Sequence, residues 1–429
     1  MNRNPAVRKA VDIALLRRRV SAARTSRRRG PLAPYRRILA VPGALAFTLA
    51  GLAARLPLSM LGVATVAMIA AVRDSYALAG AVSATGVVVT AATAPLLGRL
   101  VDRYGQARVA LPGAAVFACG AVAMLLCVRL GAPDWALFVC CAGECGIPSI
   151  GAMTRARWTE LFRDDPAAAH TANSLEQVLD ECCFMVGPVL ALVLCTAAFP
   201  EAGLLCAALL LTLGTLLFTA QRRTEPPARP AAPGSPGAAL RMPGLGVVTA
   251  VFLATGALFG SMEVSTVAVL DVLGGGPAKG GVLALQAAGS CLAGVVFGGL
   301  TLRGPLVGRF TAGVAGMAAG VLPLTAADGL GVLAALLFLA GTATAPTMIS
   351  GMTLVQRLVP PGRLTEGMST AYTGLLIGIS AGAAAAGRIV EGFGAARGYA
   401  VPATAGALAL VVALAGSGRL RAALRPECG

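Results

Sequence analysis

Five ionisable residues stand inside long apolar stretches of the sequence, where a charge is costly unless it faces a water-filled cavity or a partner. They are Arg55, Glu144, Asp180, Glu181 and Glu263. A carboxyl group held in a low-dielectric cavity can exchange a proton near neutral pH. These residues are therefore candidates for coupling proton movement to the binding of a small molecule.

Asp180 and Glu181 are neighbours in the sequence and cannot point the same way, because adjacent residues of a helix are about 100° apart. We expect one carboxyl to face a cavity and the other to pack against a neighbouring helix. The alternative is a purely structural role, with Arg55 paired to Glu181 or to Glu144. The residue types alone leave both interpretations open.

The composition is typical of a protein with many membrane spans. Hydrophobic residues make up 57% of the 429 residues and charged residues only 13%, about half the charged share of an average soluble protein. Arg is strongly preferred over Lys beside abundant Ala and Gly, which indicates a bacterial sequence of high GC content. The eleven Cys lie mostly in apolar runs and indicate small buried side chains rather than a metal site.

Twelve apolar runs are long enough to cross a bilayer as helices. They lie near 43–71, 76–97, 109–130, 134–154, 171–196, 201–219, 245–270, 278–301, 306–325, 329–351, 369–391 and 398–418. Between the sixth and seventh runs lies Gln221–Pro243, a stretch rich in Pro, Ala, Gly and Arg without periodicity, which predicts a linker. The predicted organisation is a basic tail (1–38), two six-helix bundles (39–220 and 245–418), a cytoplasmic linker (221–244) and a C-terminal tail (419–429).

The positive charge is distributed in a way that predicts orientation. Of the 35 Arg and Lys, 29 fall on the side of the N-terminus and 4 on the other side, which predicts that both termini are cytoplasmic. The first 37 residues contain 12 Arg or Lys, and a basic tail beside an apolar helix indicates contact with anionic inner-leaflet lipids. We expect no nucleic-acid partner despite the net charge of +16.

A short charged segment, Gly98-Arg-Leu-Val-Asp-Arg-Tyr-Gly-Gln-Ala-Arg108, connects the second and third runs. It resembles the loop signature between helices 2 and 3 of the major facilitator superfamily. Gly98, Asp102, Arg103 and Gly105 fall on signature positions, as does Leu100. Gln106 and Ala107 stand where the family usually has basic residues, and Arg108 supplies the charge there.

The resemblance implies an all-α membrane protein with 12 transmembrane helices in two pseudo-symmetric six-helix bundles. The Ser59-Met60 pair repeats as Ser261-Met262 about 202 residues later, as such a duplication predicts. The resemblance also implies that the signature is a gate. Asp102 and Arg103 would then pair across the cytoplasmic ends of the two bundles.

The fifth run contains Gly187-Pro188, and a Gly-Pro pair softens a helix by removing a backbone hydrogen bond. The pair is similar to part of a helix-5 signature in the drug–proton antiporter branch of the superfamily. Together with the acidic candidates, this similarity implies proton-coupled efflux of drug-like or amphipathic compounds. We expect a secondary transporter that works by alternating access, as a monomer in the bacterial inner membrane.

Two alternatives remain. The first is a proton-coupled importer of a small organic anion or metabolite, with Arg55 as the anion contact. The second is a non-transporting membrane sensor or scaffold that uses the basic tail. No phosphate-binding loop, zinc pattern or nucleophile motif is present, so we expect neither an enzyme nor a cofactor or bound metal.

Overall fold

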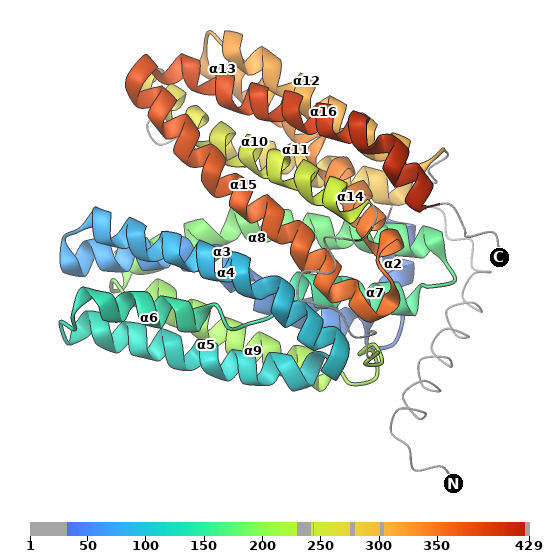
Figure 1. Cartoon of the computed structure of the whole chain (residues 1–429). Helices are drawn as coiled ribbons and strands as arrows, with labels where there is room; N and C mark the ends of the chain where they lie inside the picture. Colours follow the sequence, from blue (N-terminus) through green and yellow to red (C-terminus); the bar gives the residue numbers. More distant parts are fainter. Residues whose placement is uncertain (1–31, 230–241, 243, 275–278, 301–303, 425–429) are drawn as a thin grey trace. The chain divides into compact units, whose positions relative to one another are not determined.

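The computed structural model describes residues 32–229, 242, 244–274, 279–300 and 304–424, and these residues form helices without any strand (Figure 1). The predicted all-α class is therefore confirmed. The basic tail up to residue 31 and most of the predicted linker lie outside the described residues.

Eighteen helices follow one another along the described chain, three of them short 3-10 helices. Their bounds are α2 Ala33–Leu39, α3 Ala44–Arg73, α4 Tyr76–Tyr104, α5 Gln106–Arg129, α6 Asp134–Glu144, α7 Ile150–Leu161, α8 Pro166–Ala197, α9 Ala202–Ala220, α10 Leu245–Val272, α11 Lys279–Gly299, α12 Leu306–Val321, η3 Leu322–Ala326, α13 Leu330–Gly341, α14 Thr344–Leu358, η4 Pro361–Arg363, α15 Leu364–Phe393, η5 Ala395–Tyr399 and α16 Ala400–Ala423.

Eleven segments of the described chain are long and apolar enough to cross a membrane. The remaining predicted span, the fourth in chain order near 134–154, is instead two shorter helices, α6 and α7. The break follows from Gly146 and Pro148, since Pro lacks the N–H that would continue a helix and disfavours helical geometry in the residue before it. Glu144, predicted in the middle of a span, is instead the last residue of α6.

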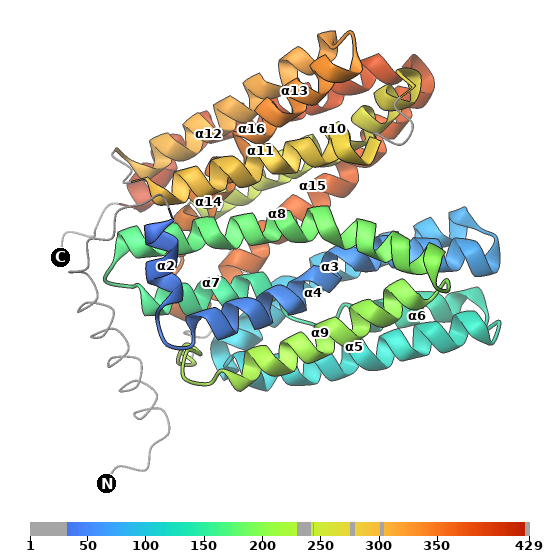
Figure 2. The same cartoon turned by 180° about the vertical axis from the view of Figure 1, so that it is seen from behind.

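The helices form two compact units. The first contains α2 to α7, most of α8, α9 and the short segment Pro361–Glu366. The second contains Asn173–Glu181 from the middle of α8, then α10 to α14, most of α15, and α16. Figure 2 shows α8 as one continuous helix, and both α8 and α15 thus contribute residues to each unit.

The same helix pairings recur in the two units, as the internal sequence repeat predicts. In the first unit α3 packs on α9 and α5 packs on both α6 and α9; in the second, α10 packs on α16 and α12 packs on α13, α14 and α16. The methionines of the repeated pair occupy equivalent cores. Met60 is fully buried beside Met68 and Met124, and Met262 is buried beside Met317 and Leu333.

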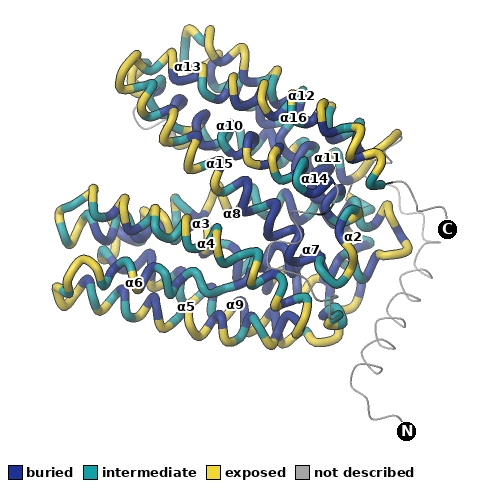
Figure 3. The backbone as a smooth tube through the Cα atoms, in the orientation of Figure 1, coloured by how far each residue is buried: buried dark blue, intermediate teal, exposed yellow. Residues whose placement is uncertain are grey.

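Burial does not follow hydrophobicity in α7. This helix carries Thr154, Arg155 and Arg157, yet every residue from Ile150 to Trp158 is buried, as the dark tube in Figure 3 shows. The long apolar helices, by contrast, expose large side chains such as Leu126 and Leu217 on one face. Exposed apolar faces of this kind are what a lipid environment requires.

Candidate functional site

The signature segment is helical almost throughout, which corrects the prediction of a loop. Gly98 to Tyr104 are the last turns of α4, and α5 begins at Gln106. Gly105 alone separates the two helices and has φ +95°, a conformation that side chains with a Cβ rarely adopt. The α4–α5 reversal therefore depends on this single glycine.

Asp102 caps the start of α15 from the end of α4. Its carboxylate accepts hydrogen bonds from the backbone N–H of Thr365, at 3.0 Å, and of Glu366, at 2.9 Å. The first N–H groups of a helix have no partner within the helix and lie at the positive end of its dipole. A carboxylate satisfies two of them and places a negative charge at that end.

Gly98 makes this cap sterically possible. A Cβ on Gly98 would lie 2.9 Å from the carbonyl oxygen of Thr365 and 3.0 Å from the Cα of Glu366. The backbone of α4 therefore approaches the beginning of α15 more closely than any side chain allows. Both signature residues act on the same two residues of the segment Pro361–Glu366.

The basic residues of the signature lie differently. Arg103 and Arg108 are exposed, and neither forms an ion pair with any residue that the structure describes. The guanidinium of Arg103 lies 5.2 Å from the ring centroid of Tyr104. The charge partner expected for Arg103 is thus absent among the described residues, whereas Asp102 contacts helix backbone rather than a charged side chain.

A buried arginine centre lies directly behind the signature, and the sequence analysis missed it. Arg157 of α7 is fully buried and donates from Nε to the side-chain oxygen of Gln106 at 2.7 Å. Its other nitrogens donate to Thr224 Oγ1 and to the carbonyls of Gln221 and Phe218 at 3.0–3.1 Å. Gln106, which replaces a usual basic residue, therefore serves as an acceptor for this guanidinium.

The same centre joins the end of α9 to the start of α5. The carboxylate of Glu225 accepts a hydrogen bond from the backbone N–H of Ala107 at 3.2 Å, and Glu225 is buried. The Arg157 guanidinium also lies 3.8 Å from the Phe218 ring centroid, within cation–π range. The only signal in the sequence was the presence of two nearby arginines, Arg155 and Arg157, at the end of an apolar run. Such a pair bears on membrane orientation and does not reveal which residues the arginines contact.

The acids of α8 bind different helices, as their angular separation predicts. The Tyr372 hydroxyl of α15 donates to Asp180 Oδ2 at 3.0 Å. Glu181 Oε1 accepts from the Ser290 hydroxyl of α11 at 2.9 Å and from Gln177 Nε2 at 3.0 Å. All of these groups belong to the second unit.

Two further polar residues of this stretch were not predicted. Glu176, one helical turn before Asp180, is fully buried. Asn173 exchanges hydrogen bonds with the side-chain amide of Gln356 on α14: Asn173 Nδ2 donates at 2.7 Å and Gln356 Nε2 donates back at 2.9 Å. The stretch from Asn173 to Glu181 therefore contains both amides and acids at helical spacing.

Gly187 and Pro188 lie within an unbroken helix, and Gly187 has a packing role. A Cβ on Gly187 would overlap the hydroxyl of Ser59 on α3. That hydroxyl donates to the Cys183 carbonyl at 2.7 Å, next to the carbonyl of Phe184 that Pro188 leaves without its helical donor. The predicted flexible pair thus also forms a close contact between α3 and α8.

Glu144 ends α6 in a buried position. Its side chain is 6% exposed, and Oε1 has no hydrogen-bond partner among the described residues. The backbone of α5 presses on it, because a Cβ on Gly120 would lie 2.9 Å from the Glu144 backbone nitrogen. No ion pair joins Glu144 to Arg55 within the described chain, so that structural alternative is not seen.

Arg55 is buried where α3 meets the start of α7. Its Nε donates to the Gly51 carbonyl at 3.3 Å, and Pro57 follows within the same helix. A Cβ on Gly151 would lie 3.5 Å from Arg55 Cδ and 3.3 Å from a terminal nitrogen of Arg155. Two arginines thus flank the same glycine in the first turn of α7.

Glu263 lies apart from the other candidates. It is exposed on α10, and within the described chain it forms no hydrogen bond or ion pair. The described residues also hold no group of three or more His, Cys, Asp and Glu able to bind a metal ion. Of the five predicted residues, Arg55 and Glu144 thus belong to the first unit, and Asp180, Glu181 and Glu263 belong to the second.

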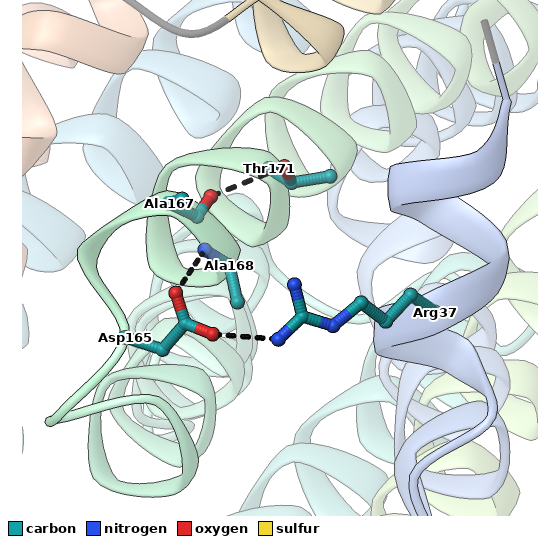
Figure 4. Close-up of polar contacts among 5 residues, drawn as sticks. All are labelled: Arg37, Asp165, Ala167, Ala168 and Thr171. Atoms are coloured by element: carbon teal, nitrogen blue, oxygen red, sulfur yellow. Dashed lines mark hydrogen bonds and ion pairs between the residues drawn. The ribbon is translucent and has the colours of Figure 1, made fainter. Parts of the chain in front are cut away.

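The end of the basic tail is anchored to the first unit through α2. Arg37 Nη2 lies 2.8 Å from Asp165 Oδ2, and Asp165 Oδ1 accepts from the backbone N–H of Ala168 at 3.2 Å, which caps α8 (Figure 4). Tyr35 and Ile38 are buried, and burial raises the pKa of Tyr35 to about 12. The last residues of the predicted tail are therefore ordered.

The fold of this chain recurs in solved structures. The human organic anion transporter MFSD10 (TETRAN) superposes with a TM-score of 0.70 at 17% identity, over 86% of this chain and 98% of that one. A bacterial homologue of the iron transporter ferroportin, in an outward-facing state, gives 0.69 at 16% identity, over 87% and 99%. The proton:xylose symporter XylE gives 0.64 at 14% identity, over 86% and 95%.

Comparison with curated proteins finds no match to this chain. At such low identity the solved structures establish the fold alone. The family model of the Major Facilitator Superfamily, however, matches residues 44–311, more than half of the sequence. The chain is therefore a transporter rather than an enzyme, and it belongs to the Major Facilitator Superfamily.

Proposed function

We propose that this protein is a proton-coupled exporter of drug-like or amphipathic small molecules that works by alternating access. It would reside in the bacterial inner membrane as a monomer, with both termini in the cytoplasm and anionic lipids beside its basic tail. The distribution of Arg and Lys supports the orientation.

Glu144 carries the proposal of proton coupling. A buried carboxylate without a hydrogen-bond or ion-pair partner is expensive, so the neutral acid is the form that such a site favours. Uptake and release of one proton would change the charge at the end of α6, beside the break before α7. Asp180 and Glu181 provide a second set of acids, whose contacts include the hydroxyl groups of Tyr372 and Ser290.

Asp102 and Gly98 support the proposal of a gate. The Asp102 carboxylate bonds the first residues of α15, and a movement of α15 would break two hydrogen bonds at once. Arg103, Gly105 and Arg108 complete the predicted gating motif, with Gly105 setting the reversal. Gly187 and Pro188 would allow α8 to bend against α3 during the cycle.

One observation favours the importer of a small organic anion. Arg55 and Arg155 are buried on either side of Gly151, at the first turn of α7. Backbone N–H groups at a helix start and two guanidinium groups together favour an anion. In this case Arg55→Gln would abolish anion uptake and spare efflux of cations.

Reconstituted vesicles with an entrapped pH indicator test the main proposal. Lipophilic cations and small acids are added in turn to wild type, Glu144→Gln and the double variant Asp180→Asn/Glu181→Gln. We expect cation-dependent proton flux in wild type and a loss of at least tenfold in Glu144→Gln. Glu391→Gln, on the last turns of α15, serves as the matched control. Cation flux without proton flux in wild type would refute the coupling.

A further inference from the structure

Two cysteines of the α5–α6 hairpin are in contact. Cys127 Sγ of α5 lies 3.8 Å from Cys140 Sγ of α6. A disulfide needs sulfurs at about 2.05 Å, so the two atoms would have to approach by roughly 2 Å. The pair joins consecutive antiparallel helices within the first unit.

The surroundings hold the Cys127 backbone in place. Arg73, the last residue of α3, donates to the carbonyls of Cys127, at 3.0 Å, and Ala132, at 2.6 Å. The backbone N–H of Ala132 also donates to the Cys127 carbonyl at 3.0 Å. These contacts fix the backbone at Cys127, and its thiol lies against that of Cys140.

The position of the pair exposes it to oxidants. It lies close to the α5–α6 turn, the end that the Arg and Lys distribution predicts to be outside the cytoplasm, where thiols are not kept reduced. Cys127 is half-buried and Cys140 is buried, so Cys127 is the thiol that a small oxidant reaches first. Glu144 lies one helical turn beyond Cys140 on the same face of α6.

We propose that Cys127 and Cys140 are a peroxide-sensitive modification site that forms a reversible disulfide and restricts the α5–α6 hairpin beside Glu144. The Cys127 thiol attacks one peroxide oxygen, the O–O bond breaks, the thiol proton passes to the leaving oxygen, and a sulfenic acid and one water form. The Cys140 sulfur then attacks the sulfenic sulfur, the S–S bond forms, the S–O bond breaks, and a second water leaves. Both sulfurs are oxidised, and one hydrogen peroxide is reduced to two waters.

The full-length protein in sealed vesicles tests the proposal by its chemistry alone. Samples treated with hydrogen peroxide are alkylated under denaturing conditions, digested and analysed by mass spectrometry, with and without dithiothreitol. We expect a Cys127–Cys140 linked peptide that dithiothreitol removes, while Cys119, an exposed thiol on the same α5, stays unlinked. Linkage of other cysteines, or over-oxidised Cys127 with alkylated Cys140, would overturn the proposal.

The regulatory part rests on the proposed transport function and has its own readout. Oxidised wild type should carry substrate-dependent flux several-fold more slowly than reduced wild type, and dithiothreitol should restore it. Cys140→Ser should be insensitive to peroxide, and Cys119→Ser should behave as wild type. Equal flux in linked and reduced protein would refute the regulation, and absence of flux in both would refute the transport proposal instead, because the linked peptide is measured separately.

Discussion

The carboxylate of Asp102 and the backbone N–H of Glu366 are joined by a hydrogen bond of 2.9 Å, although 264 residues separate them in the sequence. This contact turns a charged signature at the end of α4 into a cap for α15. A carboxylate suits this position because it accepts both hydrogen bonds and places a negative charge at the positive end of the helix dipole.

Replacement of Asp102 by Ala should destabilise the protein, because two N–H groups of α15 lose their acceptor. Loss of a capping side chain typically costs about 1–2 kcal/mol. Thermal unfolding in detergent measures the change. Arg103→Ala is the matched control, since Arg103 is exposed and has no ion pair within the described chain. Equal melting temperatures for both variants would contradict the capping role.

The close approach at Gly98 predicts a contrast within one helix. Gly98→Ala forces a methyl group against Thr365 and Glu366 and should cost about 1–3 kcal/mol, as overpacking does. Gly80→Ala, also on α4 but with nothing within 4 Å of the added Cβ, should be neutral or stabilise by up to about 1 kcal/mol. Unfolding of the two variants side by side decides the point; similar effects would show that no close contact exists at Gly98.

Gly187 could be needed for its close contact with Ser59 or for the flexibility of α8, and a pair of substitutions distinguishes the two roles. Gly187→Ala places a Cβ on the Ser59 hydroxyl and should lower both stability and transport. Ser59→Gly in the same molecule removes the obstacle, so the double variant should recover much of the stability, a coupling that a double-mutant cycle measures. If Gly187 served only to make α8 flexible, Ser59→Gly would give no recovery.

The ion pair between Arg129 and Glu201 in the first unit predicts a dependence of stability on acid. Arg129 Nε lies 2.8 Å from Glu201 Oε1, and this hydrogen bond holds the pKa of Glu201 below its ordinary value. A lowered folded-state pKa stabilises the protein above the unfolded value, about 4.3, and the benefit is lost as pH falls through the folded value. Melting temperatures from pH 6 to pH 3 should therefore fall less steeply in Arg129→Gln. Parallel curves would exclude the pair as a source of acid sensitivity.

Hydropathy was sufficient to locate the membrane helices, because each apolar run must be long enough to cross the bilayer. It was less informative about the fourth span, where Gly146 and Pro148 end α6 within an otherwise apolar window. Burial of a polar helix such as α7 is invisible to hydropathy. Arg157 of this helix donates to Phe218 of α9 and to Gln221 and Thr224, which follow α9, and these partners lie more than 60 residues away in the sequence.

The residue types of the candidate site could be predicted from the sequence, but the residues that they contact could not. Asp180 and Glu181 could be singled out as acids within a span, and their divergence followed from helix geometry. Their contacts with Tyr372 and Ser290 are set by residues more than 100 positions away. Asn173 and Gln356 are neutral, so nothing in the sequence indicated that they interact. They are 183 residues apart and form a reciprocal pair of hydrogen bonds.

Proton coupling through Glu144 is tested most directly by separating driven transport from passive exchange. Vesicles are loaded with a labelled lipophilic cation, and its movement is followed with an imposed pH gradient and, separately, as exchange against unlabelled cation without a gradient. The account predicts that Glu144→Gln loses gradient-driven transport at least tenfold and retains exchange close to wild type. Gradient-driven transport in Glu144→Gln at the wild-type rate would contradict it.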